Sequence, residues 1–115
     1  MFLERIDPVH RLSEAVIAGD LVFLAGQVPG DTSLDIRGQT ADVLAAIDGL
    51  LERCGSDKSR IVDVTIFLAD LADYEGMNEA WDAWLDRDNP PARATVQAQL
   101  ANPEWKVEIK IVAAR

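Results

Sequence analysis

The spacing of apolar residues changes several times along this chain of 115 residues, and these changes constrain its fold most. Residues 40–51 carry apolar side chains at every third or fourth position, which predicts a helix with one buried face. Gly55 is expected to end this helix by adopting a left-handed backbone conformation. A second helix is predicted between a cap at Asp70 or Asp73 and the end at Asn89-Pro90-Pro91. The buried face of the first helix is expected to carry Thr40, Val43, Leu44, Ile47, Leu50 and Leu51. That of the second is expected to carry Met77, Trp81, Trp84 and Leu85.

Segments with an apolar residue at every second position predict the strands. Residues 2–6 predict a first strand, and residues 14–18 and 21–26 predict a hairpin about the turn Gly19-Asp20. Residues 60–68 predict a further strand, and two more begin near Arg93 and Lys106. The strand at residues 60–68 is expected to place on one face Val62, Val64, Ile66 and Leu68.

The order of these elements predicts an α+β fold with a mixed sheet. A helix that connects two strands normally makes a parallel crossover. Two helices cannot cover both faces of a sheet of about six strands, so both are expected on one face. The uncovered face then predicts a homo-oligomer, in which sites lie between subunits.

The last two strands hold the first candidates for chemistry. If they pair as a hairpin around Asn102-Pro103, Arg93 and Glu108 project from the same side of the sheet. A guanidinium is a rigid fork of donors suited to a carboxylate, and a nearby glutamate can orient or deprotonate water. An ordinary cross-strand ion pair on a solvated face is the alternative. Depending on register, the uncovered face carries either Arg93, Thr95 and Glu108 or Asp63 with Phe67.

Charge and composition exclude several classes of function. The 11 Lys and Arg against 20 Asp and Glu give a net charge of −9, which opposes binding to nucleic acid or anionic membranes. No apolar run approaches the ~18 residues of a transmembrane helix and no signal-peptide pattern is present, so a cytosolic protein is expected. Cys54, the single cysteine, is expected to be a structural thiol, and the lone His10 has no cluster with which to bind zinc.

Several segments, taken in order, resemble the reactive intermediate deaminase (RidA/YjgF) family. The resemblance covers about residues 10 to 115, and a single domain of this family is expected over residues 1–115. It rests on Gly19–Pro29, Gln39-Thr40, Asp63–Asp70, Met77-Asn78, Pro91–Arg93 and Val107–Ile109. The segments that are similar in particular to the YoaB branch of the family are Asp82–Trp84, Thr95–Ala98 and Lys106–Ala114.

The resemblance implies a chorismate-mutase-like fold and a homotrimer, in which the sheets form a central barrel and ligand clefts lie between subunits. It implies hydrolysis of reactive 2-imino or 2-enamino acids to 2-keto acids and ammonia, without a cofactor or metal. Small carboxylate metabolites and further copies of the chain are then its partners. Arg93 matches the arginine that grips the substrate carboxylate, and Glu108 matches the glutamate that positions water. Asn78 matches a position near the pocket, and Gly26 matches the glycine whose backbone borders it.

Three positions depart from the pattern of the best-studied deaminases of the family. Leu12, Ala25 and Thr95 stand where those proteins carry a tyrosine, a serine and a cysteine. Leu12 and Ala25 cannot replace the phenol or the hydroxyl, so a more apolar pocket is expected. The three positions, together with the loop at residues 27–38, are expected to set the side-chain selectivity of the cleft. The alternative function is a non-catalytic module that binds or senses a 2-keto acid. Ribonuclease activity conflicts with the negative charge of the chain.

Three tryptophans and Asn78 have structural alternatives to a role in the site. Trp81 and Trp84 are expected in the core, since they lie at helical spacing. Trp105 lies beside a predicted turn, where it either lines an interface cleft or has only a structural role. The amide of Asn78 either anchors a loop or contacts a ligand.

Overall fold

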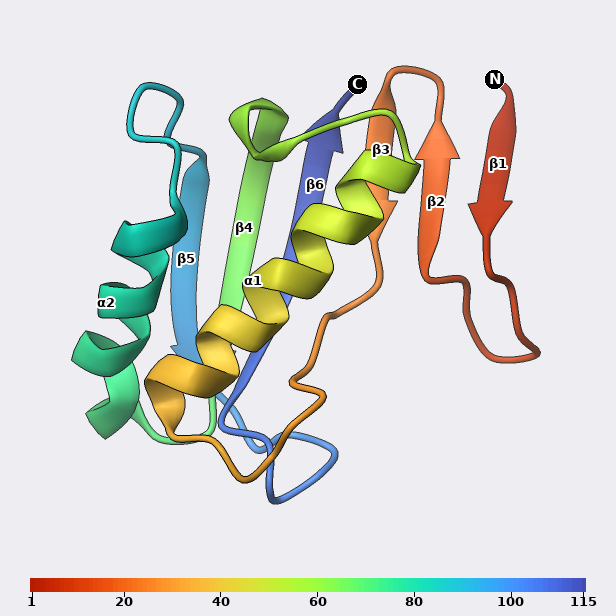
Figure 1. Cartoon of the computed structure of the whole chain (residues 1–115). Coiled ribbons are helices and arrows are strands. Elements are labelled where there is room, and N and C mark those ends of the chain that lie inside the picture. The colour runs from red at the N-terminus through yellow and green to blue at the C-terminus, as the bar shows by residue number, and fades with distance from the viewer.

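The computed structural model describes all residues, Met1–Arg115, and contains one mixed sheet of six strands in the order β1-β2-β3-β6-β4-β5 (Figure 1). Two helices and two short 3-10 turns complete the fold. The elements are β1 (Leu3–Ile6), β2 (Ala15–Ala18), β3 (Leu21–Leu24), α1 (Ile36–Arg53), η1 (Lys58–Arg60), β4 (Ile61–Leu68), η2 (Leu71–Asp73), α2 (Tyr74–Trp84), β5 (Ala92–Gln97) and β6 (Val107–Ala114). Their order is the predicted one.

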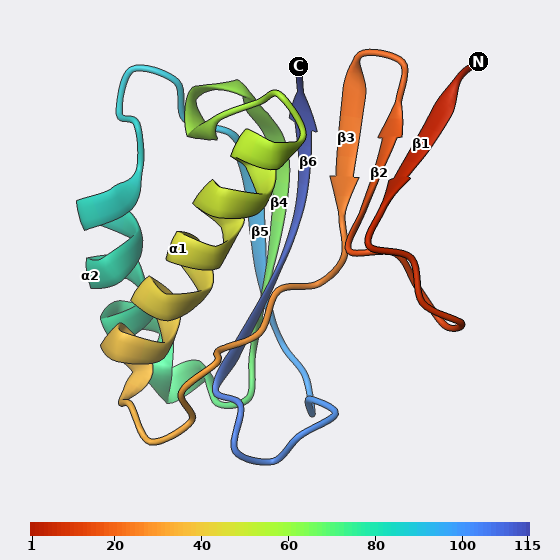
Figure 2. The same cartoon turned by 45° about the vertical axis from the view of Figure 1, so that its right-hand side comes forward.

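Both helices lie on the same side of the sheet, as predicted, and the other face is bare (Figure 2). We call these the covered face and the bare face. The covered face holds the core. Along β6, the residues that point toward the helices are buried, and they alternate with less buried residues that point to the bare face. The central strand β6 contributes Val107, Ile109, Ile111 and Ala113, each with no exposed surface. None of the helices is both long and apolar enough to span a bilayer.

The connections follow the expected crossovers, but the last two strands do not form a hairpin. β5 pairs with β4 in parallel through the crossover that contains α2. β6 lies between β3 and β4 and is antiparallel to both. The predicted hairpin is therefore wrong. The parallel crossover occupies one edge of β4, so β6 pairs at the other edge, where its apolar residues lie under the helices.

This register separates Arg93 from Glu108. Arg93 is the partner of Val64 in the sheet, and Val64 is buried on the covered face. Glu108 pairs with Phe67, which points the other way. The two predicted site residues thus lie on opposite faces, and their predicted common side is wrong. Of the two predicted sets, the bare face carries Asp63 with Phe67, together with Glu108, while Arg93 and Thr95 lie on the covered face.

Three local expectations also differ from the structure. The pairing of β4 with β6 shifts register between Ile61 and Asp63, and this irregularity leaves Val62 exposed while Ile61 is buried in its place. α2 ends at Trp84, before the prolines that were expected to stop it. Asp70 caps the turn η2 by accepting from the Ala72 N–H, whereas Asp73 makes no capping bond through its side chain.

Candidate functional site

The side chain of Arg93 extends from the edge strand β5 to helix α2. Its Nη1 donates to the amide oxygen of Asn78 at 2.9 Å, and its Nη2 donates to the hydroxyl of Tyr74 at 3.4 Å. The guanidinium carbon lies 5.3 Å from the ring centre of Trp81, a cation–π distance. Trp81 is buried in the core, as predicted, and it also supports the guanidinium. One face of α2 therefore fixes the position of this side chain.

No carboxylate pairs with Arg93. The ion pairs in the structure join Arg37 to Glu79 and Arg53 to Asp7. The cross-strand ion pair offered as an alternative for Arg93 and Glu108 is therefore absent. All the partners of Arg93 are neutral, so a half-buried positive charge stays available to an anion in a chain whose net charge is −9.

Glu108 lies at the start of β6 on the bare face, against the backbone of Gly26. A Cβ atom at Gly26 would overlap the Glu108 carboxylate, so only glycine allows this close approach. Two backbone hydrogen bonds of 2.9 and 3.0 Å between Gln27 and Ile109 hold the segment in place. The ammonium of Lys110 donates to the Leu24 carbonyl and forms no ion pair with Glu108. The Glu108 carboxylate is therefore free of a cationic partner.

The three positions that depart from the family pattern lie in different surroundings. Thr95 follows Arg93 on the covered face of β5, and its hydroxyl is buried without a hydrogen-bond partner. Ala25 is half-buried beside Gly26 and donates its N–H to the Glu14 carbonyl. Leu12 lies between β1 and β2 with half of its surface exposed. Arg93, Asn78 and Thr95 thus form one group on the covered face, and Glu108 and Gly26 form a second group on the bare face.

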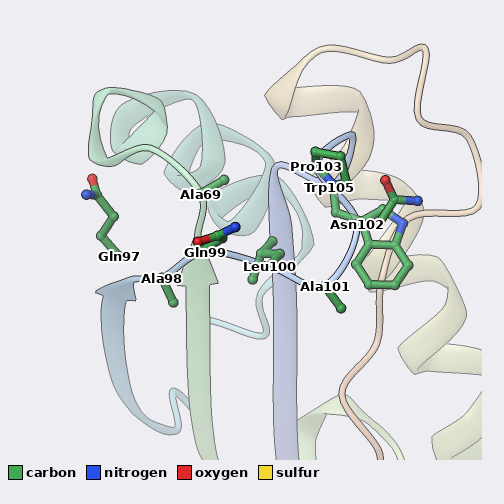
Figure 3. Close-up of a pocket in the computed structure, with 9 residues that line it drawn as sticks. All are labelled: Ala69, Gln97, Ala98, Gln99, Leu100, Ala101, Asn102, Pro103 and Trp105. Carbon is green, nitrogen blue, oxygen red and sulfur yellow. The ribbon is translucent and has the colours of Figure 1, made fainter.

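Neither group lines a cavity within the single chain. The connection from β5 to β6 lines a pocket of about 530 Å³, with Trp105 beside Asn102 on one side and Gln97 on the other (Figure 3). A second pocket of about 310 Å³ lies between α1 and α2 and includes Asp48, Lys58 and Trp84. The sheet separates the two groups, so one protomer alone does not bring the predicted site together.

Two residues have structural roles that the sequence did not reveal, although Gln39 was already part of a segment that resembles the family. Gln39 is fully buried, and its amide nitrogen donates to the carbonyls of Thr32, Leu34 and Glu104. Its amide oxygen accepts from the Lys106 N–H at 2.8 Å, so Gln39 joins the loop before α1 to the loop before β6. A glutamine at the start of an apolar helical stripe was the available signal. The second residue is Tyr74, which contacts Arg93. Nothing in the spacing of Tyr74 in the sequence indicates this contact.

The thiol of Cys54 is buried at the end of α1, and this burial raises its pKa. A raised pKa disfavours the thiolate, so the thiol is a poor nucleophile. This is the structural role that the sequence predicted. The structure contains no group of three or more His, Cys, Asp or Glu side chains that could hold a metal ion.

Comparison with known proteins gives consistent results over the whole chain. A family model described as endoribonuclease L-PSP matches residues 2–115. The RutC family protein YoaB of Escherichia coli is 52% identical over 114 residues, which are 99% of each chain. A RutC family protein of Haemophilus influenzae is 52% identical over 114 residues, or 98% of each chain. A crystal structure of a YjgF family member from Neisseria meningitidis matches with a TM-score of 0.97 at 50% identity, covering 100% of this chain and 96% of that one.

Proposed function

Because this chain belongs to the RidA/YjgF family, we propose that it is a hydrolytic deaminase of reactive 2-imino or 2-enamino acids. The products are a 2-keto acid and ammonia. The observation that carries the proposal is the state of Arg93, whose guanidinium is held by neutral groups and has no carboxylate partner. A positioned, uncompensated guanidinium of this kind favours a carboxylate ligand.

The chemistry needs orientation and proton transfer. Arg93 binds the substrate carboxylate, which places the neighbouring C=N carbon at a fixed distance. Water adds to the C=N carbon and gives a carbinolamine, whose nitrogen takes up one proton of the water. The carbinolamine hydroxyl then loses the second proton of the water, the C=O bond forms, and the C–N bond breaks as the nitrogen takes up that proton and leaves as ammonia. Glu108 accepts the proton of the attacking water and returns it to the leaving nitrogen. The oxidation state of the carbon does not change, so the reaction balances without a redox cofactor.

The separation of Arg93 and Glu108 supports a site shared by two protomers of a homotrimer. One subunit supplies Arg93, Asn78 and Thr95 from its β5 edge. Its neighbour supplies Glu108 and Gly26, with Ala25 and Leu12 at the border of the cleft. The bare face favours such an assembly, because it exposes large apolar side chains that a partner would cover, among them Leu3, Leu21, Phe23 and Val96.

The matched family model carries the name of an endoribonuclease, but charge argues against that activity here. A net charge of −9 repels the phosphate backbone of RNA. The proposed ligands are instead small carboxylates, and cytosolic location remains a prediction. A module that binds 2-keto acids without catalysis would use the same Arg93, so the experiment must separate binding from turnover.

The test follows ammonia release from freshly generated iminopyruvate, with and without the purified protein. We expect the protein to accelerate release, and Arg93→Ala to lower kcat/KM by at least about tenfold, since charge-assisted hydrogen bonds of ~1.5–3 kcal/mol are lost. Arg60→Ala is the matched control, because Arg60 is an exposed arginine in η1 that makes no ion pair. It should keep the wild-type rate.

Each other outcome has a definite meaning. Saturable binding of pyruvate with no effect on ammonia release would show a binding module and contradict the deaminase. Acceleration that is equal in wild type and in Arg93→Ala would remove Arg93 from the site. Release of nucleotides from RNA at a comparable rate would favour the activity in the name of the family model.

A further inference from the structure

Tyr74 contacts Arg93 but has no role in the mechanism above. It is the single tyrosine of the chain and the first residue of α2. Its hydroxyl oxygen lies 3.4 Å from Arg93 Nη2, and 39% of the residue surface is exposed. The hydroxyl is therefore adjacent to the guanidinium and open to an incoming ligand.

The guanidinium keeps free donors beside this hydroxyl. Arginine has five N–H donors, of which the contacts with Asn78 and Tyr74 use two and leave three. Trp81 supports the guanidinium through its ring. A carboxylate can therefore still bind two N–H groups without displacing any neighbour of Arg93.

The hydroxyl proton of Tyr74 is also free. Tyr74 accepts in its contact with Arg93 and makes no other hydrogen bond through its side chain. A carboxylate oxygen bound to Nη2 would lie about 2.8 Å from that nitrogen. The phenol oxygen lies 3.4 Å from the same nitrogen, so a rotation of the O–H bond can direct its proton to the ligand.

We propose that Tyr74 is a further donor to the bound carboxylate and helps to select it. This inference rests on the proposed binding of a carboxylate by Arg93. A hydrogen bond from a hydroxyl to a charged oxygen is about twice as strong as one to a neutral oxygen. Tyr74 therefore favours an ionised acid over the neutral amide of the same shape.

The experiment compares pyruvate with pyruvamide as ligands of the full-length protein, by calorimetry. We expect Tyr74→Phe to weaken pyruvate binding by about tenfold, while pyruvamide binding changes by no more than about twofold. The melting temperature should stay unchanged, because the ring remains in place. Ser59→Ala, which removes a hydroxyl bonded to Asp57 in η1, serves as the control and should bind both ligands as wild type does.

The outcomes separate this inference from the proposed function. Wild-type pyruvate affinity in Tyr74→Phe would overturn the role of Tyr74, while loss of binding in Arg93→Ala would leave the proposed function in place. Equal losses for both ligands with a lower melting temperature would make Tyr74 a packing residue, which also overturns the inference. Unchanged affinity in Arg93→Ala would contradict the proposed function itself.

Discussion

The two faces of the sheet differ most clearly along β6. On the covered face, Ile109 and Ile111 are fully buried under the helices. On the bare face, the alternate residues Glu108 and Val112 are only partly buried and Lys110 is exposed. One strand thus combines a complete core on one side with an incomplete surface on the other. The covered face accounts for the stability of the protomer, whereas the bare face leaves large apolar side chains exposed.

The covered face loses its apolar character at the edge strand β5. Its three residues there are Arg93, Thr95 and Gln97, in place of the aliphatic residues of β4 and β6. This polar edge lies beside α2, which supplies Asn78 and Tyr74 to Arg93. Arg93 and its neutral partners thus lie at the border of the core, whereas Glu108 lies on the bare face, which the proposed assembly would cover.

The largest expected effect is the loss of assembly when a charge enters the bare face. Phe23 pairs with Val16 and Val112 on that face and is 39% exposed. Phe23→Asp should convert the proposed trimer to monomers and abolish the proposed activity, because a carboxylate cannot be buried there unpaired. Sedimentation velocity at micromolar concentration measures this.

Ala46→Asp is the control, since Ala46 is exposed on α1, which lies on the opposite side of the sheet from the bare face (Figure 2). It should remain a trimer. If Phe23→Asp stays trimeric, the bare face is not the assembly face.

A large loss of stability is expected on the covered face, in β6. Ile109→Ala should lower the free energy of unfolding by about 2–5 kcal/mol, because it leaves a cavity in the core. Lys110→Met, one residue along, should change it less, because it removes one hydrogen bond of an exposed ammonium and leaves no cavity in the core. Urea unfolding of the two variants measures both free energies. Equal losses of stability would contradict the difference between the covered face and the bare face.

Gly26→Ala tests how closely the backbone positions Glu108. The added methyl overlaps the far end of the Glu108 side chain, which can move without disturbing the sheet. Stability should therefore change little, while kcat falls by up to about 100-fold, as displacement of a catalytic group by ~1 Å can cause. Steady-state kinetics on iminopyruvate, with the melting temperature as control, measures both. An unchanged kcat would show that the position of Glu108 is unimportant.

The smallest effect concerns the ion pair between Arg37 of α1 and Glu79 of α2. The Arg37 guanidinium lowers the pKa of Glu79 below its usual value of 4.5. The pair therefore stabilises the fold above pH 4.5, and this contribution is lost as the pH falls through the lowered pKa. Glu79→Gln should be slightly less stable than wild type at pH 7 and equal to it in strong acid. A difference that persists in acid would assign it to packing.

The elements of this fold could be predicted because their signals are local. The stripe from Thr40 to Leu51 and the alternation from Val107 to Ile111 depend only on neighbouring residues. The position of β6 could not be predicted, because it depends on which edge of β4 the crossover strand occupies. The exposure of Val62 depends on a register shift between strands that are far apart in sequence.

The same limit applies to the site. Arg93, Asn78, Gly26 and Glu108 were proposed from motifs, and the structure places them in two groups on opposite faces. The contact of Tyr74 with Arg93 joins a helix to an edge strand, and no spacing within either segment predicts it. Sequence patterns thus found the candidate residues, while their grouping required the strand order.

Subunit complementation tests the central claim most directly, namely that Arg93 of one protomer acts with Glu108 of the next. Arg93→Ala and Glu108→Gln chains, carrying different affinity tags, are co-expressed, and trimers that contain both are purified. Each such trimer has one intact pair in its three interfaces, so about one third of wild-type deaminase activity should return although each parent is inactive. Mixed trimers as inactive as their parents would place both residues in one chain's site and contradict the account.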